Sequence, residues 1–183
     1  KHLNTIKQLS ENKDSNITQY ISEIVDDFNI MNPIDYCNNP TVNLITHRYY
    51  EICKKNNINF TISIKNANID FIKEHDITAL LDNLLENAVE SALMTNEKFI
   101  DFSISTRNSN FVIIKISNSC NKKPKYIDGT LVSSKSTSGM HGIGTRSIKR
   151  VVEKYNGNLE MKFDNDTKTF TSVIGINSNL PSN

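Results

Sequence analysis

Long hydrophobic runs are absent from this sequence of 183 residues. Its uninterrupted apolar stretches reach about four residues, far short of the roughly 20 that a membrane-spanning helix requires. An excess of charge of one sign is also absent, because 21 Lys and Arg residues are balanced by 20 Asp and Glu residues. This balance argues against nucleic acid or an anionic membrane as the partner. The first residues lack the pattern of a secretory signal.

Cysteine is scarce and unpaired in sequence. Cys37, Cys53 and Cys120 are widely spaced and form no CxxC pair. A disulfide framework and a zinc site are therefore not expected, and three free thiols suit a reducing cytosol. Asparagine, in contrast, is abundant, as are Ile and Lys. The composition alone can therefore account for an Asn at any one position, without a specific role. The chain begins with Lys1 rather than Met, so we expect a piece of a longer protein.

Residues 1–38 are predicted to form a helical hairpin. The first helix carries Leu3, Ile6 and Leu9 at helical spacing, and the second carries an apolar stripe from Ile17 to Met31. Two short helices cannot bury such stripes alone, so they need the rest of the chain or a second copy. Prolines and asparagines at positions 32–40 then separate the hairpin from the C-terminal part of the chain.

Residues 39–183 are predicted to form a mixed helix and strand domain. In chain order we expect a helix from Thr41, a strand at 58–64, a helix capped by Asp76 and ending near Met94, two antiparallel strands around a turn at 108–110, a lid without secondary structure at 119–140, a helix stopped by Gly157, and a final hairpin. This order predicts an α+β sandwich with helices on one side of the sheet, not a doubly wound parallel fold.

The helix "LLDNLLENAVESAL" (80–93) places polar residues in line opposite its core stripe. Asn83, Asn87 and Glu90 lie one turn apart, facing away from a stripe made by Ile77, Leu81, Leu84, Leu85, Ala88 and Ala92. One interpretation is an ordinary solvated face. The other is a magnesium site, because Mg²⁺ prefers oxygen ligands and is commonly held by one or two protein oxygens plus substrate phosphates.

Three glycines precede the next predicted helix, in "SGMHGIGTRSIKRVV". Gly139, Gly142 and Gly144 would let backbone N–H groups approach a phosphate at a helix N-terminus. The order GxxGxG differs from the P-loop, which needs Gly-Lys-Ser/Thr, and from the dinucleotide fingerprint GxGxxG. Taken alone, three such glycines are also typical of a flexible linker.

Together these segments resemble a known family. "NLLENAVESA" resembles the N box, and "HGIGTRSIKRVVEKYNG" the second glycine box, of the GHKL ATP-binding proteins, which include gyrase, a heat-shock chaperone, mismatch-repair proteins and sensor histidine kinases. The nearest resemblance is to the peptide-sensing AgrC- and VirS-like kinases, which share NLLxNAxE, an Asn in place of the DxGxG aspartate, and a final hairpin like "FTSVIGI". The resemblance implies a GHKL (Bergerat-type) α/β sandwich preceded by a helical hairpin, with ATP and Mg²⁺ as cofactors.

The resemblance also implies roles for single residues. Asn87 would be the main Mg²⁺ ligand with Asn83 in support, and Glu90 would face the same cavity. Lys135 matches a lysine of the lid, and Gly142 and Gly144 would form the turn against the phosphates. His141 lies inside that turn, and Asn118 would contact the adenine. An Asn carbonyl can accept from the adenine amino group, without the charge that Asp supplies. The first glycine box departs from the family, because "NSCNKK" contains no glycine.

The function implied is that of the cytoplasmic kinase core of a two-component sensor. It would transfer the γ-phosphoryl of Mg-ATP to a histidine, act on a cognate response regulator, and form a homodimer through the hairpin. "KHL" (1–3) resembles the end of the acceptor pattern HDxKxHL, so the acceptor is expected just upstream of Lys1, with His2 as the alternative. The full protein would be anchored to the membrane through an N-terminal sensor domain.

Two other functions stay open. Hydrolytic GHKL ATPases carry a Glu four residues before the magnesium Asn, where this chain has Asn83, which cannot act as a general base. The chain would therefore hydrolyse ATP poorly. A degenerate scaffold that dimerises and has lost nucleotide binding is the second alternative, suggested by the missing first glycine box.

The predicted hairpin generates a test of the dimer. Replacing Ile24 with Glu places a charge in the middle of the apolar stripe, so any dimer formed through that stripe should dissociate. Light scattering at high protein concentration measures the change in mass. A wild-type chain that is monomeric there would contradict the predicted dimer.

Overall fold

The computed structural model describes residues 36–65, 67–108, 110–123, 125–127, 130–132 and 143–179. Apart from residues 36–38, the predicted hairpin and its dimer interface lie outside this part of the chain. The described elements, in order, are α3 (Pro40–Lys55), β1 (Asn59–Lys65), α4 (Glu74–Leu93), β2 (Phe99–Arg107), β3 (Phe111–Ser119), β4 (Lys125–Ile127), β5 (Thr130–Val132), α5 (Ile143–Lys154), β6 (Asn158–Asp164) and β7 (Thr169–Asn177).

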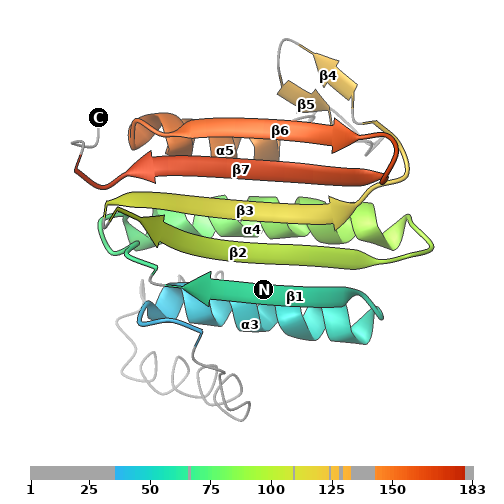
Figure 1. Cartoon of the computed structure of the whole chain (residues 1–183), viewed down its shortest axis with the longest axis horizontal. Helices are drawn as coiled ribbons and strands as arrows, with labels where there is room; N and C mark the ends of the chain where they lie inside the picture. The colour runs from blue at the N-terminus through green and yellow to red at the C-terminus, as the bar shows by residue number, and fades with distance from the viewer. Residues whose placement is uncertain are drawn as a thin grey trace, which may run out of the picture. The chain divides into compact units, whose positions relative to one another are not determined.

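Five strands form one mixed sheet in the order β1-β2-β3-β7-β6. The β2–β3 and β6–β7 pairs are hairpins, β3 and β7 pair antiparallel between them, and β1 runs parallel to β2. Parallel neighbours need a crossover, and α4 supplies it. The helices α3, α4 and α5 all lie behind the same face of this sheet (Figure 1). The predicted α+β sandwich with helices on one side is confirmed.

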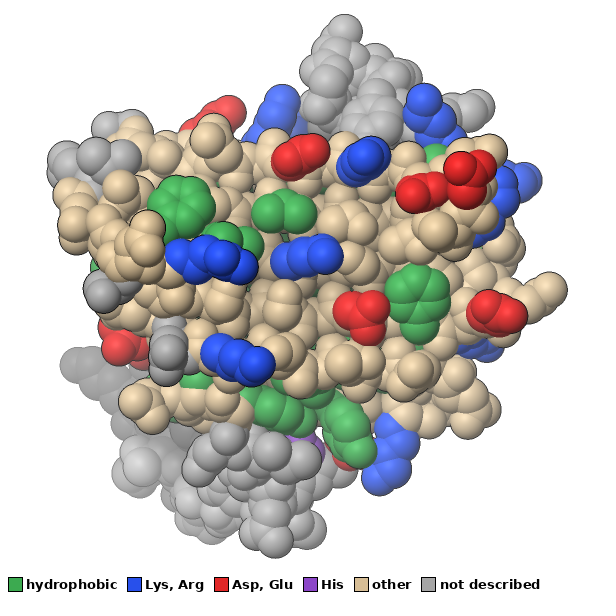
Figure 2. Space-filling view, viewed as in Figure 1, with side chains coloured by type: hydrophobic (Ala, Val, Ile, Leu, Met, Phe, Trp, Pro, Cys, Tyr) green, Lys and Arg blue, Asp and Glu red, His purple; other side chains and the backbone are tan. Residues whose placement is uncertain are grey.

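The two faces of the sheet follow from alternation along its strands. In β2, Ile100, Phe102 and Ile104 are buried under the helices, whereas Asp101 between them is exposed. The β7 strand alternates in the same way and buries Ile174 and Ile176. The opposite face is solvated, and Figure 2 shows basic and acidic side chains interspersed over it. A sheet with one dry and one wet face matches the antiparallel pattern expected from the sequence.

The α4 helix supplies much of the core. All six residues of its predicted stripe are buried, and Leu80 and Val89 are buried beside them. The side of the helix that carries Asn87 is exposed. The amphipathic division predicted for α4 is therefore confirmed, and it determines which residues face outward.

Two helices end on asparagine where glycine is the usual residue. Asn57 after α3 and Asn156 after α5 both adopt left-handed backbone, with φ of 55° and 50°. The next residue in each case donates to a carbonyl five positions back, Ile58 to Cys53 and Gly157 to Val152, each at 2.9 Å. The prediction that Gly157 stops α5 was wrong in detail, because Asn156 makes the turn. Gly157 is needed for space, since a Cβ there would lie 2.9 Å from the Gly175 carbonyl oxygen.

Asp76 does not cap α4 as predicted. The residue before the helix is Lys73, which makes no side-chain cap, and Asp76 lies inside the first turn with its side chain buried. Its Oδ2 accepts from Lys154 Nζ at 2.6 Å and from Tyr155 Oη at 2.7 Å. Tyr155 Oη in turn accepts from the Lys73 backbone N–H at 3.0 Å. The carboxylate therefore joins the start of α4 to the end of α5.

The predicted lid contains secondary structure. Within 119–140, β3 continues to Ser119, and β4 and β5 pair as a short antiparallel hairpin outside the main sheet (Figure 1). Residues 133–142 lie outside the described part of the chain. The expectation of a wholly irregular segment was therefore wrong, because two three-residue strands are too short to produce a visible alternation in sequence.

The Asp76 network predicts a change in stability. Burial raises the pKa of Asp76, but the hydrogen bonds from Lys154 and Tyr155 outweigh it and hold that pKa below its ordinary value of 3.8. Replacing Asp76 with Asn should lower the free energy of unfolding by about 1.5–3 kcal/mol, the range for hydrogen bonds to charged groups. Chemical denaturation measures it, with Glu74→Gln as the control that removes an exposed carboxylate from the same turn.

The pH dependence of this difference follows from the sign of the shift. A carboxyl whose folded pKa is lowered stabilises the protein above its unfolded pKa, and this contribution is lost as pH falls through the folded pKa. The stability difference between wild type and Asp76→Asn should therefore be present above pH 3.8 and shrink as pH falls below that value. A difference that grew as pH fell below 3.8 would contradict the assigned network.

Candidate functional site

The candidate site begins on the polar face of α4. Asn83 and Glu90 are half-buried and Asn87 is exposed, while Leu84, Leu85, Ala88 and Val89 between them are buried in the core. These three side chains lie one turn apart because α4 runs unbroken from Glu74 to Leu93. The rigid helix thus presents two amide groups and one carboxylate along one line.

The first turn of α5 lies directly against this face. A Cβ added to Gly144 would lie 2.8 Å from Asn83 Oδ1, and its three nearest atoms would all belong to Asn83. Asn83 is oriented from its other end, because Nδ2 donates to the Ala79 carbonyl at 2.5 Å. Two motifs that are separated by about 60 residues of sequence therefore lie so close that residue 144 has no room for a side chain. An ordinary solvated face would have no such partner.

Asn118 lies near the end of β3, on the core side of the sheet. Its side chain is buried, and Nδ2 donates to the Ser119 carbonyl at 2.9 Å. The same carbonyl accepts from Ser91 Oγ of α4 at 3.1 Å, and Ser119 Oγ accepts from Thr95 Oγ1 at 2.9 Å. The end of β3 is thereby attached to the last turn of α4 through Ser91, next to Glu90, and to Thr95 just after the helix. The sequence contains no signal for this attachment, since its members are 24 and 28 residues apart.

Three predicted site residues fall outside the described part of the chain: Lys135, His141 and Gly142. Among the described residues, no group of three His, Cys, Asp or Glu side chains is arranged to hold a metal ion. A metal here would therefore depend on few protein oxygens, of which Asn87 is the exposed amide on the polar face of α4. This donor set fits Mg²⁺, which retains several waters and shares ligands with phosphates.

The comparison with protein families decides the identity of the domain. The GHKL domain matches residues 72–176, more than half of the chain. The chain belongs to the GHKL family. The match includes α4, β3 and α5, the three elements that meet at the candidate site.

One curated protein similar to this GHKL chain is described as a probable sensor kinase. The chain is 29% identical over 112 residues to a probable C4-dicarboxylate sensor kinase of Bacillus subtilis (strain 168), an alignment that covers 57% of the chain and 20% of that protein. The chain thus corresponds to a fifth of the length of this curated relative. The described helices of the GHKL chain include none long and apolar enough to cross a bilayer.

Solved structures with the same fold are histidine kinase domains. The catalytic domain of histidine kinase ThkA superposes with a TM-score of 0.58 at 17% identity, covering 77% of this chain and 92% of that one. Acinetobacter baumannii histidine kinase AdeS gives 0.54 at 12% identity, covering 76% and 64%. Mycobacterial sensor histidine kinase MprB gives 0.53 at 14% identity, covering 73% and 93%. At these identities the likeness shows the GHKL fold.

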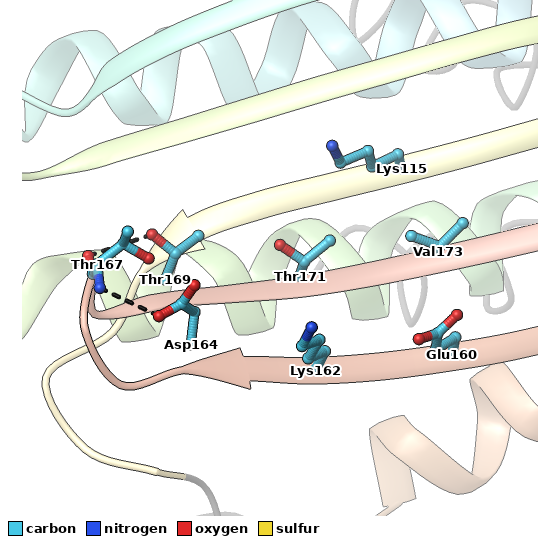
Figure 3. Close-up of a pocket in the computed structure, with 8 residues that line it drawn as sticks. All are labelled: Lys115, Glu160, Lys162, Asp164, Thr167, Thr169, Thr171 and Val173. Carbon is cyan, nitrogen blue, oxygen red and sulfur yellow. Dashed lines mark hydrogen bonds between the residues drawn. The ribbon is translucent and has the colours of Figure 1, made fainter.

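The solvated face of this GHKL domain carries a separate hollow of about 450 Å³. Figure 3 shows it along β6 and β7, where Thr171 and Val173 of β7 face outward. Its charged side chains are balanced, with two lysines and two acids: Lys115, Lys162, Glu160 and Asp164. Asp164 is engaged with its own turn, accepting from the backbone N–H of Thr167 at 3.2 Å. This hollow lies on the other side of the sheet from Asn87 and has no chemistry that the GHKL motifs use.

Proposed function

We propose that the chain is the catalytic core of a two-component sensor histidine kinase, which binds Mg-ATP and transfers its γ-phosphoryl group to a histidine. The observation that carries this proposal is the contact between Asn83 of the N box and Gly144 of the second glycine box. Family membership and the sensor kinase relatives support it independently.

The magnesium ligand proposed is Asn87, because its amide is exposed on the rigid face of α4. Glu90 lies one turn further along and would contribute negative charge to the same cavity. Magnesium, when bound, would neutralise phosphate charge and bridge phosphate oxygens. The supporting role predicted for Asn83 remains a prediction, and its oxygen is the atom closest to the space beside Gly144.

The nucleotide would lie between α4 and the start of α5. Gly142 and Gly144 would allow the backbone there to approach the phosphates. Lys135 and His141 would contribute their side chains to the same phosphates. Asn118 would contact the adenine amino group through Oδ1, because its Nδ2 already donates to the Ser119 carbonyl. In such a site the protein contributes position and charge neutralisation more than covalent chemistry.

Several finer proposals rest on the sequence resemblance. These are membership of the peptide-sensing AgrC- and VirS-like branch, a boundary between hairpin and catalytic domain near residue 38, dimerisation through the hairpin, a cognate response regulator, and membrane anchoring by a sensor domain outside this chain. The hydrolytic alternative is disfavoured because Asn83 takes the position of the water-activating Glu. An amide with its Nδ2 bound to a helix carbonyl cannot take a proton from water.

Replacing Asn87 with Ala tests the magnesium role. Affinity for a fluorescent ATP analogue should fall at least about tenfold in the presence of Mg²⁺, whereas the melting temperature should stay close to that of wild type because Asn87 lies off the core. Glu86→Ala is the matched control, since Glu86 is also exposed on α4 but neighbours Tyr49 of α3. Wild-type affinity in Asn87→Ala would assign Asn87 to an ordinary solvated face.

The position of the acceptor generates a second test. Incubated with labelled ATP, the present chain should acquire no stable label and should hydrolyse ATP slowly. A chain extended upstream through the expected His-Asp pair should acquire a label that is acid-labile and base-stable, as a phosphohistidine is. Strong labelling of the present chain that His2→Gln removes would make His2 the acceptor.

A further inference from the structure

The side-chain amide of Asn83 is hydrogen-bonded through its nitrogen, and its oxygen faces the first turn of α5. Its Nδ2 donates to the Ala79 carbonyl one turn back at 2.5 Å, which fixes the direction of the amide plane. Its Oδ1 then faces the first turn of α5, 2.8 Å from the position that a Cβ of residue 144 would occupy. Asn83 could rotate away only by giving up the bond to Ala79. The oxygen therefore occupies the space that the missing side chain of Gly144 leaves.

The other end of α5 is also fixed to α4. Lys154 Nζ and Tyr155 Oη both bond to Asp76 Oδ2, at 2.6 and 2.7 Å. Between the two ends, Ile148, Val151 and Val152 are buried in the core. Since the C-terminal end is bonded to a buried carboxylate, a change in spacing at Asn83 would move mainly the first turn of α5. That turn is where the phosphates of the proposed function would bind.

We infer that Asn83 is a positioning residue, in place of the supporting metal ligand that the sequence predicts. Its side chain sets the distance between α4 and the first turn of α5, and it acts on nucleotide binding through Gly144. This inference rests on the proposed function, since it concerns the same site. It separates the two asparagines of the N box by role. Asn87 is exposed and would meet the metal, whereas the oxygen of Asn83 is in contact with protein.

The two roles give different dependences on Mg²⁺. Loss of a metal ligand weakens binding only when Mg²⁺ is present, because without the ion the ligand has nothing to bind. Loss of a positioning residue displaces the turn itself and weakens binding by a similar factor with and without Mg²⁺. The ratio of nucleotide affinities in Mg²⁺ and in EDTA therefore distinguishes Asn83 from Asn87.

The experiment is a double-mutant cycle on the full 183-residue chain, using Asn83→Ala, Gly144→Ala and the double variant. The affinity for a fluorescent ATP analogue is measured with Mg²⁺ and with EDTA, and melting temperature is recorded for each protein. In the wild-type background, Gly144→Ala should weaken binding about tenfold or more, because its methyl group enters filled space. In the Asn83→Ala background the space is empty, so Gly144→Ala should cost little further affinity. Asn83→Ala alone should leave the ratio of affinities in Mg²⁺ and in EDTA unchanged.

Asn87→Ala serves as the matched control, and it should lower that ratio and combine additively with Gly144→Ala. The inference is overturned if Asn83→Ala lowers the ratio as Asn87→Ala does, or if Gly144→Ala costs the same affinity in both backgrounds. If Gly144→Ala does not fold, the ratio measured for Asn83→Ala alone decides. Wild-type protein that binds no nucleotide in either condition would overturn the proposed function, and the inference with it. Nucleotide binding with an additive cycle would overturn the inference alone.

Discussion

Burial of one side of α4 is the interaction on which the rest of this structure depends. Leu81, Leu85 and the other apolar residues of that side are shielded from water by the sheet and by the neighbouring helices, and each large side chain buried in this way contributes roughly 1.5–3 kcal/mol. Only one orientation of α4 about its axis buries this apolar side. In that orientation Asn83, Asn87 and Glu90 face away from the core together. Hydrophobic packing thus orients these three polar residues of α4, although none of them belongs to the core.

The second constraint is the attachment of α5 to α4. The buried residues of α5 hold it against α4, but hydrophobic burial by itself permits small sliding movements of one helix along the other. The bonds from Lys154 and Tyr155 to Asp76 determine the position of one end, and the fit of Asn83 against Gly144 determines that of the other. Such directional contacts fix the relative position of the two helices, which hydrophobic burial alone does not do. A nucleotide site needs that precision, since hydrogen bonds to phosphate weaken steeply with misplacement.

Asparagine has several different roles in this chain, which explains why its abundance is ambiguous in sequence. Asn39 caps α3, where its Oδ1 accepts from the Val42 N–H at 3.0 Å. Asn57 and Asn156 provide the left-handed turns that end two helices in a chain with six glycines. Asn83, Asn87 and Asn118, in contrast, lie along the α4, β3 and α5 junction. A short side chain with a donating NH2 group and an accepting carbonyl suits all of these positions, so residue type alone does not distinguish them.

Local pattern was sufficient for most of the fold and for the motifs. Period and turn chemistry predicted α3, α4, α5 and the two hairpins, because each buries a face that the sequence itself displays. Sequence also placed Asn83, Asn87 and Glu90 on one side of a helix. It misassigned Asp76 and Gly157, because their roles depend on partners about 80 and 20 residues away. Tertiary structure alone decided that Gly144 lies against Asn83 and that Ser119 bonds to α4. Such contacts arise between elements that the sheet topology brings together, and the sequence around one partner does not indicate the other.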